Sequence, residues 1–276
     1  MASFEQDGRR PTIPNPQFIR PANVDDLKVT QLFQEVPDEA IRQIESASKF
    51  VGLKAGESLV TARQGVDYLY IIRRGYVSIW MPPSFYPKLG GVFLAWRGPK
   101  QIIGELRKEG DAPSNTSITT YEPCELIEIR LDAFRDLART VSLLYENVAY
   151  MVLNKMWHEG RRSEVVQMNP AFRQVAQTLI FLAEDRCESF SFKQVEYAID
   201  GIIHQDELAG YAGITRKSVN EQLKKLKKKC LISLDGKKGS HSFHITIRNL
   251  HELQKIVSPD VLTKKLQESA LDHTTL

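Results

Sequence analysis

Residues 204–234 read HQDELAGYAGITRKSVNEQLKKLKKKCLISL, and their apolar positions fit two short helices separated by a break. These positions are Leu208, Ala209, Ala212, Ile214, Val219, Leu223 and Leu226. Gly213 stands at the break, where a tight turn needs a residue that tolerates a positive φ angle. Thr215 follows where an N-cap is expected, because its hydroxyl can accept a backbone N–H from the next turn. The pattern predicts a helix-turn-helix, whose second helix can enter the major groove of DNA.

A β-hairpin is expected directly after the second helix. Leu231–Leu234 is a short apolar run, and residues 235–239 form a glycine-rich turn. Phe243, Ile245 and Ile247 then alternate with polar residues, as in a half-buried strand. These features predict a hairpin wing that completes a winged helix-turn-helix.

The same segment carries a local excess of positive charge. Its basic residues are Arg216, Lys217, Lys224, Lys225, Lys227, Lys228, Lys229, Lys237 and Lys238, against the acids Asp206, Glu207, Glu221 and Asp235. This excess suits contacts with DNA phosphates, although an ordinary helical hairpin with a solvated lysine face is the alternative. The residues expected to bind DNA are His204, Gln205, Thr215, Arg216, Lys217, Ser218, Asn220, Glu221 and Lys224.

Composition places the chain among globular proteins. Its 276 residues suffice for two domains with real cores, and 42% are hydrophobic against 26% charged. No run reaches the roughly 20 apolar residues of a membrane span, and the N-terminus lacks the apolar core of a signal peptide. Cys124, Cys187 and Cys230 lie far apart, so we expect reduced thiols in the cytoplasm and no cysteine-held iron–sulfur cluster.

The N-terminal half changes from an arm to a β-rich domain. Residues 1–24 contain four prolines and three arginines, which predicts a flexible or extended arm that could fold over an anionic ligand or partner. Residues 25–48 have helical periodicity. Residues 49–131 alternate short apolar runs with turns, as in a β-roll or jelly roll. We therefore place a β-roll domain at residues 25–136.

A long helix is expected at residues 137–168. The apolar residues Leu137, Val141, Leu144, Val148 and Met151 follow the 4-3-4-3 spacing of a two-stranded coiled coil. This stripe predicts a homodimer, and a helix packed on its own β domain is the alternative. Gly160 weakens the helix, so residues 160–170 are a candidate hinge before the DNA-binding domain at 169–257. Residues 258–276 are expected to add a tail helix.

The order of these parts resembles the catabolite-activator/FNR (CRP/FNR) family of bacterial transcription regulators. Beside the helix-turn-helix, Gly104-Glu105-Leu106 is the most specific matching motif in the N-terminal half. The resemblance covers about residues 30–250. It implies an α+β fold, with an N-terminal cyclic-nucleotide-binding-type β-roll, a long dimerisation helix and a C-terminal winged helix-turn-helix. It also implies that Glu105 stands in a phosphate-binding cassette, where cyclic-AMP binders use this glutamate for the ribose hydroxyl.

The chain departs from the family at the end of that cassette. Where the family carries an arginine followed by serine or threonine, this sequence has Ser114 and Asn115. A buried cyclic phosphate without a cation would lose its charge-assisted hydrogen bonds, so cyclic AMP in the usual pose is disfavoured. Arginines can stack on purines and pair with phosphates, and some family members respond to cyclic di-GMP. We therefore rank a cyclic dinucleotide such as c-di-GMP first and expect no metal; a vacant pocket in a ligand-independent DNA-binding regulator is the alternative.

The candidate ligand-binding residues are Arg9, Arg10, Arg20, Arg63, Arg73, Arg74, Arg97, Glu105, Arg107, Ser114, Asn115 and Thr116. The second helix of the helix-turn-helix also departs from the family pattern Arg-Glu-x-x-x-Arg. Its corresponding residues are Arg216, Lys217 and Glu221. Arg216 can bind a guanine edge, and Glu221 can accept a hydrogen bond from a cytosine amine.

Three classes of function compete. The first is a dimeric transcription regulator whose DNA binding is modulated by a nucleotide. The second is a second-messenger receptor that acts through protein contacts with another regulator rather than through DNA. The third is an enzyme, which the sequence disfavours because it has no Gly-rich phosphate loop, no paired catalytic carboxylates and no nucleophile elbow. The pair His241 and His244 is too isolated to predict a metal site.

Overall fold

The structure is a computed structural model, and it describes residues 16–60, 67–82, 84, 91–104, 115–120, 122–168, 170–187, 190, 191, 193–236 and 242–258. The chain divides into two units, Met1–Met156 and Trp157–Leu276. None of the described helices is both long enough and apolar enough to cross a membrane.

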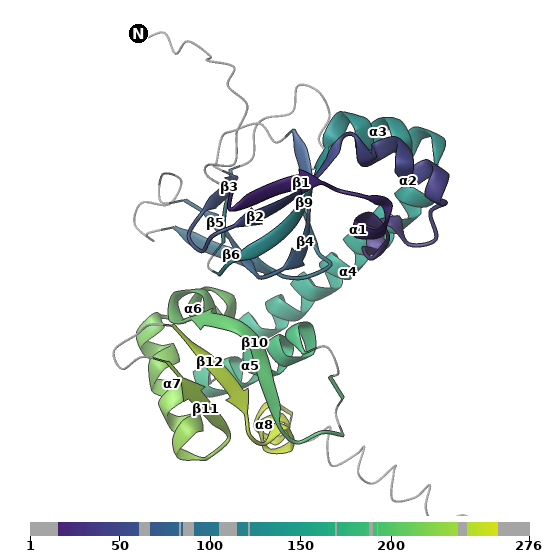
Figure 1. Ribbon diagram of the computed structural model, residues 1–276. Helices are drawn as coiled ribbons and strands as arrows, with labels where there is room; N and C mark the ends of the chain where they lie inside the picture. Colours follow the sequence, from purple (N-terminus) through teal and green to yellow (C-terminus); the bar gives the residue numbers. More distant parts are fainter. Residues whose placement is uncertain are drawn as a thin grey trace, which may run out of the picture. The chain divides into compact units, whose positions relative to one another are not determined.

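Two antiparallel sheets form the β-roll of the first unit (Figure 1). The five-stranded sheet has the order β1 (Phe18–Pro21), β2 (Ser48–Leu53), β9 (Cys124–Arg130), β4 (Tyr68–Arg74) and β7 (Ile102–Ile103). The four-stranded sheet has the order β3 (Ser58–Val60), β8 (Ser117–Thr120), β5 (Val77–Met81) and β6 (Val92–Arg97). Strands that pair within these sheets come from distant parts of the sequence, as the pairing of β2 with β9 shows. The β-roll predicted from the short apolar runs is confirmed.

Alternation along the strands sends side chains into two separate cores. Leu126 of β9 packs with Val51, Ile72 and residues of the four-stranded sheet such as Val77, so this core lies between the sheets. Ile127, the next residue, belongs to a second core on the other face of the five-stranded sheet. The period of two therefore lets one strand contribute to both cores.

Short helices cover the outer face of the five-stranded sheet. They are α1 (Val24–Lys28), the 3₁₀ turn η1 (Gln31–Phe33), α2 (Asp38–Glu45) and α3 (Leu131–Thr140). Figure 1 shows them together on one side of the strands. Their apolar residues, including Leu27, Phe33, Ile41 and Phe134, are buried against the sheet. The helical periodicity expected at residues 25–48 is confirmed.

The described part of the N-terminal arm is ordered as an edge strand. Residues of β1 pair antiparallel with β2, from Phe18 opposite Gly52 to Pro21 opposite Lys49. Gly52 leaves room for the Phe18 ring, because a Cβ at this position would lie 2.3 Å from Phe18 Cε1. Extended structure therefore begins within the predicted arm, at residue 18.

The long helix differs from the prediction. α3 ends at Thr140, Val141 adopts an extended conformation, and α4 (Ser142–Gln167) begins as a separate helix. Leu137 and Leu144 are buried in the core of their own unit, and Val148 and Met151 pack against that core. Burial in their own unit makes Leu137 and Leu144 unavailable to the predicted intersubunit seam, so the 4-3 spacing here serves a helix that packs on its own domain, which was the alternative.

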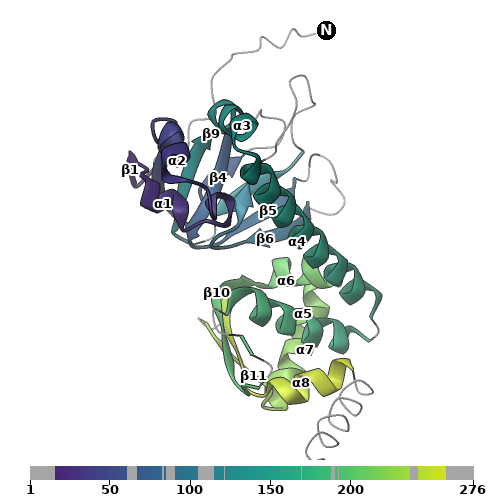
Figure 2. The same cartoon turned by 90° about the vertical axis from the view of Figure 1, so that its right-hand side faces the viewer.

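The second unit is a winged helix-turn-helix. It contains α5 (Ala171–Arg186), β10 (Tyr197–His204), α6 (Gln205–Ala212), α7 (Arg216–Lys228), β11 (Ile232–Asp235), β12 (Ser242–Ile247) and α8 (Leu250–Val257). β12 lies between β10 and β11, and the pairing of Asp235 with His244 makes β11 and β12 the predicted wing. Figure 2 shows α5, α6 and α7 on one side of this three-stranded sheet. The tail beyond Ser258 lies outside the described residues.

The last turns of α4 belong to this second unit. Val165 is fully buried with Phe181 and Ala212, and the Arg161 guanidinium pairs with Glu184 while it covers the Phe181 ring at 3.7 Å. The helix continues through Gly160 as far as Gln167. Much of the segment expected to be a hinge, residues 160–170, is thus helical, and the units divide at Met156 rather than at residue 168.

Candidate nucleic-acid interface and ligand site

The turn between α6 and α7 has the geometry that its sequence predicts. Gly213 adopts φ +70°, and the Ile214 N–H donates to the Ala209 carbonyl at 3.1 Å. The Thr215 hydroxyl oxygen accepts the Ser218 N–H at 3.2 Å, which caps α7. A Cβ at position 213 would lie 3.1 Å from Val166 Cγ2, so the end of α4 packs directly against this turn.

One face of α7 holds the helix in place. Val219, Leu223 and Leu226 are fully or almost fully buried, and Gln222 is buried beside them. The spacing of these residues leaves the opposite face free of packing contacts within the described unit. The body of the unit thus fixes α7 and presents its polar side to solvent.

The polar face of α7 carries most of the predicted DNA-binding residues. Thr215, Arg216, Lys217, Glu221 and Lys224 are exposed, and Ser218 and Asn220 are half-buried. Lys225, Lys227 and Lys228 extend the basic surface toward the C-terminal end of the helix, where the helix dipole favours cations. The Arg216 guanidinium lies 3.6 Å from Asp206, and both side chains are about half exposed. Such an exposed pair is weak and leaves Arg216 available to a ligand.

Two predicted DNA-binding residues lie elsewhere. Gln205 is only 7% exposed at the start of α6, so the structure contradicts its prediction as a surface contact. His204 is half-buried and pairs with Ser242 in the sheet, as the last residue of β10. Both residues were predicted as part of the helix-turn-helix stretch, and position in the sequence does not show which way a side chain points.

The candidate ligand residues do not form one described cluster. Arg9, Arg10, Arg63, Glu105, Arg107 and Ser114 lie outside the described residues. Asn115 is exposed and Thr116 is half-buried, just before β8. Arg97 ends β6 in one sheet, whereas Arg73 and Arg74 end β4 in the other.

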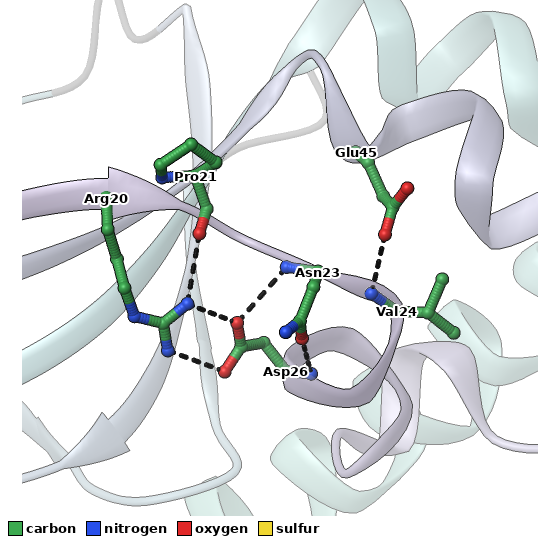
Figure 3. Close-up of polar contacts among 6 residues, drawn as sticks. All are labelled: Arg20, Pro21, Asn23, Val24, Asp26 and Glu45. Atoms are coloured by element: carbon green, nitrogen blue, oxygen red, sulfur yellow. Dashed lines mark hydrogen bonds and ion pairs between the residues drawn. The ribbon is translucent and has the colours of Figure 1, made fainter.

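Arg20 is committed to the fold of its own unit (Figure 3). Its guanidinium donates to both carboxylate oxygens of Asp26, at 2.6 and 2.8 Å, and to the Pro21 carbonyl at 3.0 Å. It also covers the Phe50 ring at 4.1 Å. Asp26 accepts the Asn23 N–H as part of the capping box that starts α1. Hydrogen bonding to Arg20 lowers the pKa of the Asp26 carboxyl.

The sequence did not reveal a buried carboxyl inside the β-roll. Glu128 pairs with Lys49 on β2 and Tyr70 on β4, and it is 9% exposed. Burial raises the pKa of Glu128, while Lys49 and Tyr70 oppose that change. Glu125 and Glu128 are three residues apart and therefore lie on opposite faces of β9, and Glu128 shares its face with Leu126 of the core between the sheets. The sequence alone did not show which of the two acidic residues is buried.

The sequence analysis also did not predict an exposed apolar surface on α4. The large exposed residues Tyr145, Tyr150, Val152, Leu153 and Met156 lie on this helix, followed by Trp157. Tyr145, Ala149, Val152 and Met156 follow a 4-3-4 spacing of exposed residues. At 100° per residue they lie about 90° around the helix from the stripe of buried Leu144 and half-buried Val148, and exposed Leu153 lies opposite Leu144. α4 is therefore apolar on two faces, and only one is covered by its own chain.

Comparison with known proteins assigns each unit to a described domain type. Residues 50–141 match the family model of the cyclic nucleotide-binding domain, and residues 173–256 match that of the Crp-like helix-turn-helix domain. These matches together span more than half of the chain. No curated protein sequence matches it.

Several solved structures share this fold at low sequence identity. FixK2 from Bradyrhizobium japonicum has a TM-score of 0.60 at 15% identity, over 76% of this chain and 96% of FixK2. A CooA mutant from Carboxydothermus hydrogenoformans has 0.60 at 14%, over 87% and 98%. The c-di-GMP-responsive global regulator CLP from Xanthomonas campestris has 0.56 at 19%, over 77% and 100%. At these identities the similarity shows the fold alone.

Proposed function

Because this chain belongs to the CRP/FNR family of transcription regulators, with a cyclic nucleotide-binding domain and a Crp-like helix-turn-helix, we propose that it is a cytoplasmic homodimer whose binding to operator DNA is controlled by a nucleotide second messenger. The family is one of regulators rather than of enzymes. The observation that carries the proposal is the exposed basic face of α7, which the packed body of its unit holds outward.

The chemistry of α7 suits the DNA major groove. Arg216 stands in the first turn, where its guanidinium can make two hydrogen bonds to a guanine edge. The lysines beyond it provide charge for phosphate contacts, which position a protein but carry no sequence information. We propose that Arg216 reads a base and that Lys224 and its basic neighbours hold the backbone.

The exposed face of α4 supports a dimer. Monomeric proteins rarely expose a continuous apolar surface of this kind, and the spacing of Ala149, Leu153 and Met156 fits a two-stranded coiled coil. A dimer would also present two α7 helices to the paired half-sites that such proteins bind. The homodimer expected from the sequence remains our proposal, with the seam moved to the opposite face of the helix.

The ligand is proposed from the positions at which the phosphate-binding cassette of this chain differs from the family pattern. The sequence offers Ser114 and Asn115 where an arginine would neutralise a cyclic phosphate, which disfavours cyclic AMP. Cyclic di-GMP is our first candidate, and the shared fold of the c-di-GMP-responsive regulator CLP supports its consideration. Because Arg20 is already paired with Asp26, we remove it from the proposed ligand contacts.

The test of DNA binding begins with selection of duplexes from a randomised pool by the full-length protein. Arg216→Ala should abolish retardation of the selected sequence, because the base contact is lost. Lys224→Ala should weaken all sequences alike and reduce the salt dependence of binding by about one unit of slope. Arg139→Ala is the matched control, since it removes an exposed arginine from α3. Unchanged retardation by Arg216→Ala would remove α7 from this role.

The ligand is tested by calorimetric titration of the protein with cyclic AMP, cyclic GMP and cyclic di-GMP. Retardation of the selected DNA is then measured in the presence of each compound. We expect binding of cyclic di-GMP and a change in DNA affinity in its presence. Ligand binding without DNA affinity at any salt concentration would favour the receptor that acts through another regulator. Cyclic AMP binding with a change in DNA affinity would overturn the ligand preference but not the DNA-binding function.

A further inference from the structure

Glu221 is the sole acidic residue of α7, whose other charged residues are six lysines and arginines. It is exposed, and it lies on the polar side of the helix between Lys217 and Lys225, which precede and follow it by four residues. A carboxylate here reduces the attraction of α7 for phosphates. Its presence in the middle of the basic face therefore needs a physical reason.

An intrahelical ion pair does not supply that reason. Glu221 makes no ion pair with any residue that the structure describes, although Lys217, Lys224 and Lys225 are all at helical spacing for one. The Lys225 ammonium instead donates to the Gln222 side-chain oxygen at 3.2 Å. Nor does packing supply it, since the buried face of α7 is formed by Val219, Gln222, Leu223 and Leu226.

We infer that Glu221 determines operator specificity by accepting a hydrogen bond from the exocyclic amine of a cytosine in each half-site. The inference rests on the proposed DNA-binding function. In the major groove, guanine presents the acceptors N7 and O6 and thymine presents O4, so a carboxylate is repelled by either of them. Cytosine presents the N4 amine without a neighbouring acceptor on its own edge. A carboxylate at this position therefore favours cytosine and disfavours guanine and thymine.

The spacing along α7 places this contact relative to that of Arg216. Five residues separate them, which is about 7.5 Å along the helix axis. Successive base pairs are about 3.4 Å apart along the duplex, so a helix that follows the groove would reach base pairs about two steps apart. The operator should therefore contain a position that depends on Arg216 and, about two base pairs away, another that depends on Glu221.

The experiment is selection from a randomised duplex pool, with sequencing, by the full-length wild type, Glu221→Gln and Glu221→Ala, with and without cyclic di-GMP. The wild type should enrich cytosine at one position in each half-site, and its replacement there should weaken wild-type binding roughly 10-fold or more. Glu221→Gln should move the preference at that position to adenine, because glutamine can bond adenine N6 and N7 together. Glu221→Ala should remove that preference and leave the Arg216-dependent position intact. Lys228→Ala is the control, because it changes charge on the same helix and should lower affinity for all sequences alike.

The outcomes separate this inference from the function on which it rests. If Glu221→Ala enriches the same bases as the wild type and only binds all DNA more tightly, the carboxylate merely repels phosphates and the inference is overturned, while the DNA-binding function stands. If the wild type enriches no sequence under either condition, the DNA-binding function fails and the inference fails with it.

Discussion

Replacement of leucine by alanine should weaken dimerisation on one face of α4 and the stability of the subunit on the other. Leu153 is 63% exposed on the uncovered face, whereas Leu144 is fully buried in the core of its own unit. Leu153→Ala should weaken the dimer and leave the stability of each subunit nearly unchanged. Leu144→Ala should destabilise the subunit by creating a cavity. Both substitutions remove the same atoms from the same helix, so each serves as the control for the other.

The expected magnitudes follow from the exposed fractions. Full burial of a leucine side chain contributes about 1.5–3 kcal/mol. Burying the exposed two-thirds of Leu153 would contribute about 1–2 kcal/mol in each subunit, or about 2–4 kcal/mol in a symmetric dimer. Loss of that burial raises the dissociation constant of the dimer roughly 30- to 1000-fold. Leu144→Ala should cost about 2–5 kcal/mol of unfolding free energy, which is about 2–4 °C of Tm for each kcal/mol.

Sedimentation equilibrium over a range of concentrations measures the dissociation constant, and thermal unfolding measures the stability. Melting curves are compared at a concentration well above the dissociation constants of the wild type and of both variants, because dissociation itself lowers the apparent stability of a dimer. A wild type that sediments as one chain at all concentrations would refute the argument. So would a Leu153→Ala variant that dimerises as tightly as the wild type.

Three further predictions concern the fold around the two candidate sites. Gly213→Ala should lower the unfolding free energy by about 1–2 kcal/mol, measured by denaturant titration, because φ is +70° and the new methyl group would press on Val166. Thr215→Ala should cost about 1 kcal/mol in the same titration through loss of the α7 N-cap, and Thr215→Ser should restore most of it. Arg20 lowers the pKa of Asp26, so the stability this pair contributes is present above the unfolded pKa near 3.9 and is lost as the pH falls through the lower folded value. The Tm difference between the wild type and Asp26→Asn should therefore be largest near neutral pH and shrink below about pH 4; a constant difference would contradict it.

The helix-turn-helix was predictable because its signals are local. Gly213 at the turn and Thr215 at the cap each act within a few residues, through a positive φ angle and a side-chain hydrogen bond to Ser218. The wing was predictable for the same reason, since its turn and alternating strand lie next to each other in sequence. Each of these features was expected from sequence spacing alone.

The assignment of α4 failed because hydrophobic periodicity does not identify the partner. Leu144 and Val148 have the spacing of a coiled-coil seam, but the same spacing fits a helix that lies on its own domain. Val141 interrupts the helix between α3 and α4. The sequence did not predict this break, because a valine within an apolar stripe is not a helix-ending signal. The ion pair of Arg20 with Asp26 was not predicted for a similar reason, because nothing in the sequence shows that Asp26 lies within reach of it.

The exposed face of α4 also bears on how a sequence preference can arise at α7. A single helix with six basic residues and one acid gains most of its affinity from phosphates, and this part falls steeply with salt and does not discriminate between sequences. The discrimination proposed for Arg216 and Glu221 concerns a few base pairs, which is too little to select an operator among many competing sites. When two copies are joined, the second half-site is bound at a high effective concentration, and the two discriminations combine. In the proposed dimer the residues around Leu153 would therefore contribute to operator selection without contact with a base, because the gain would be lost when the subunits separate.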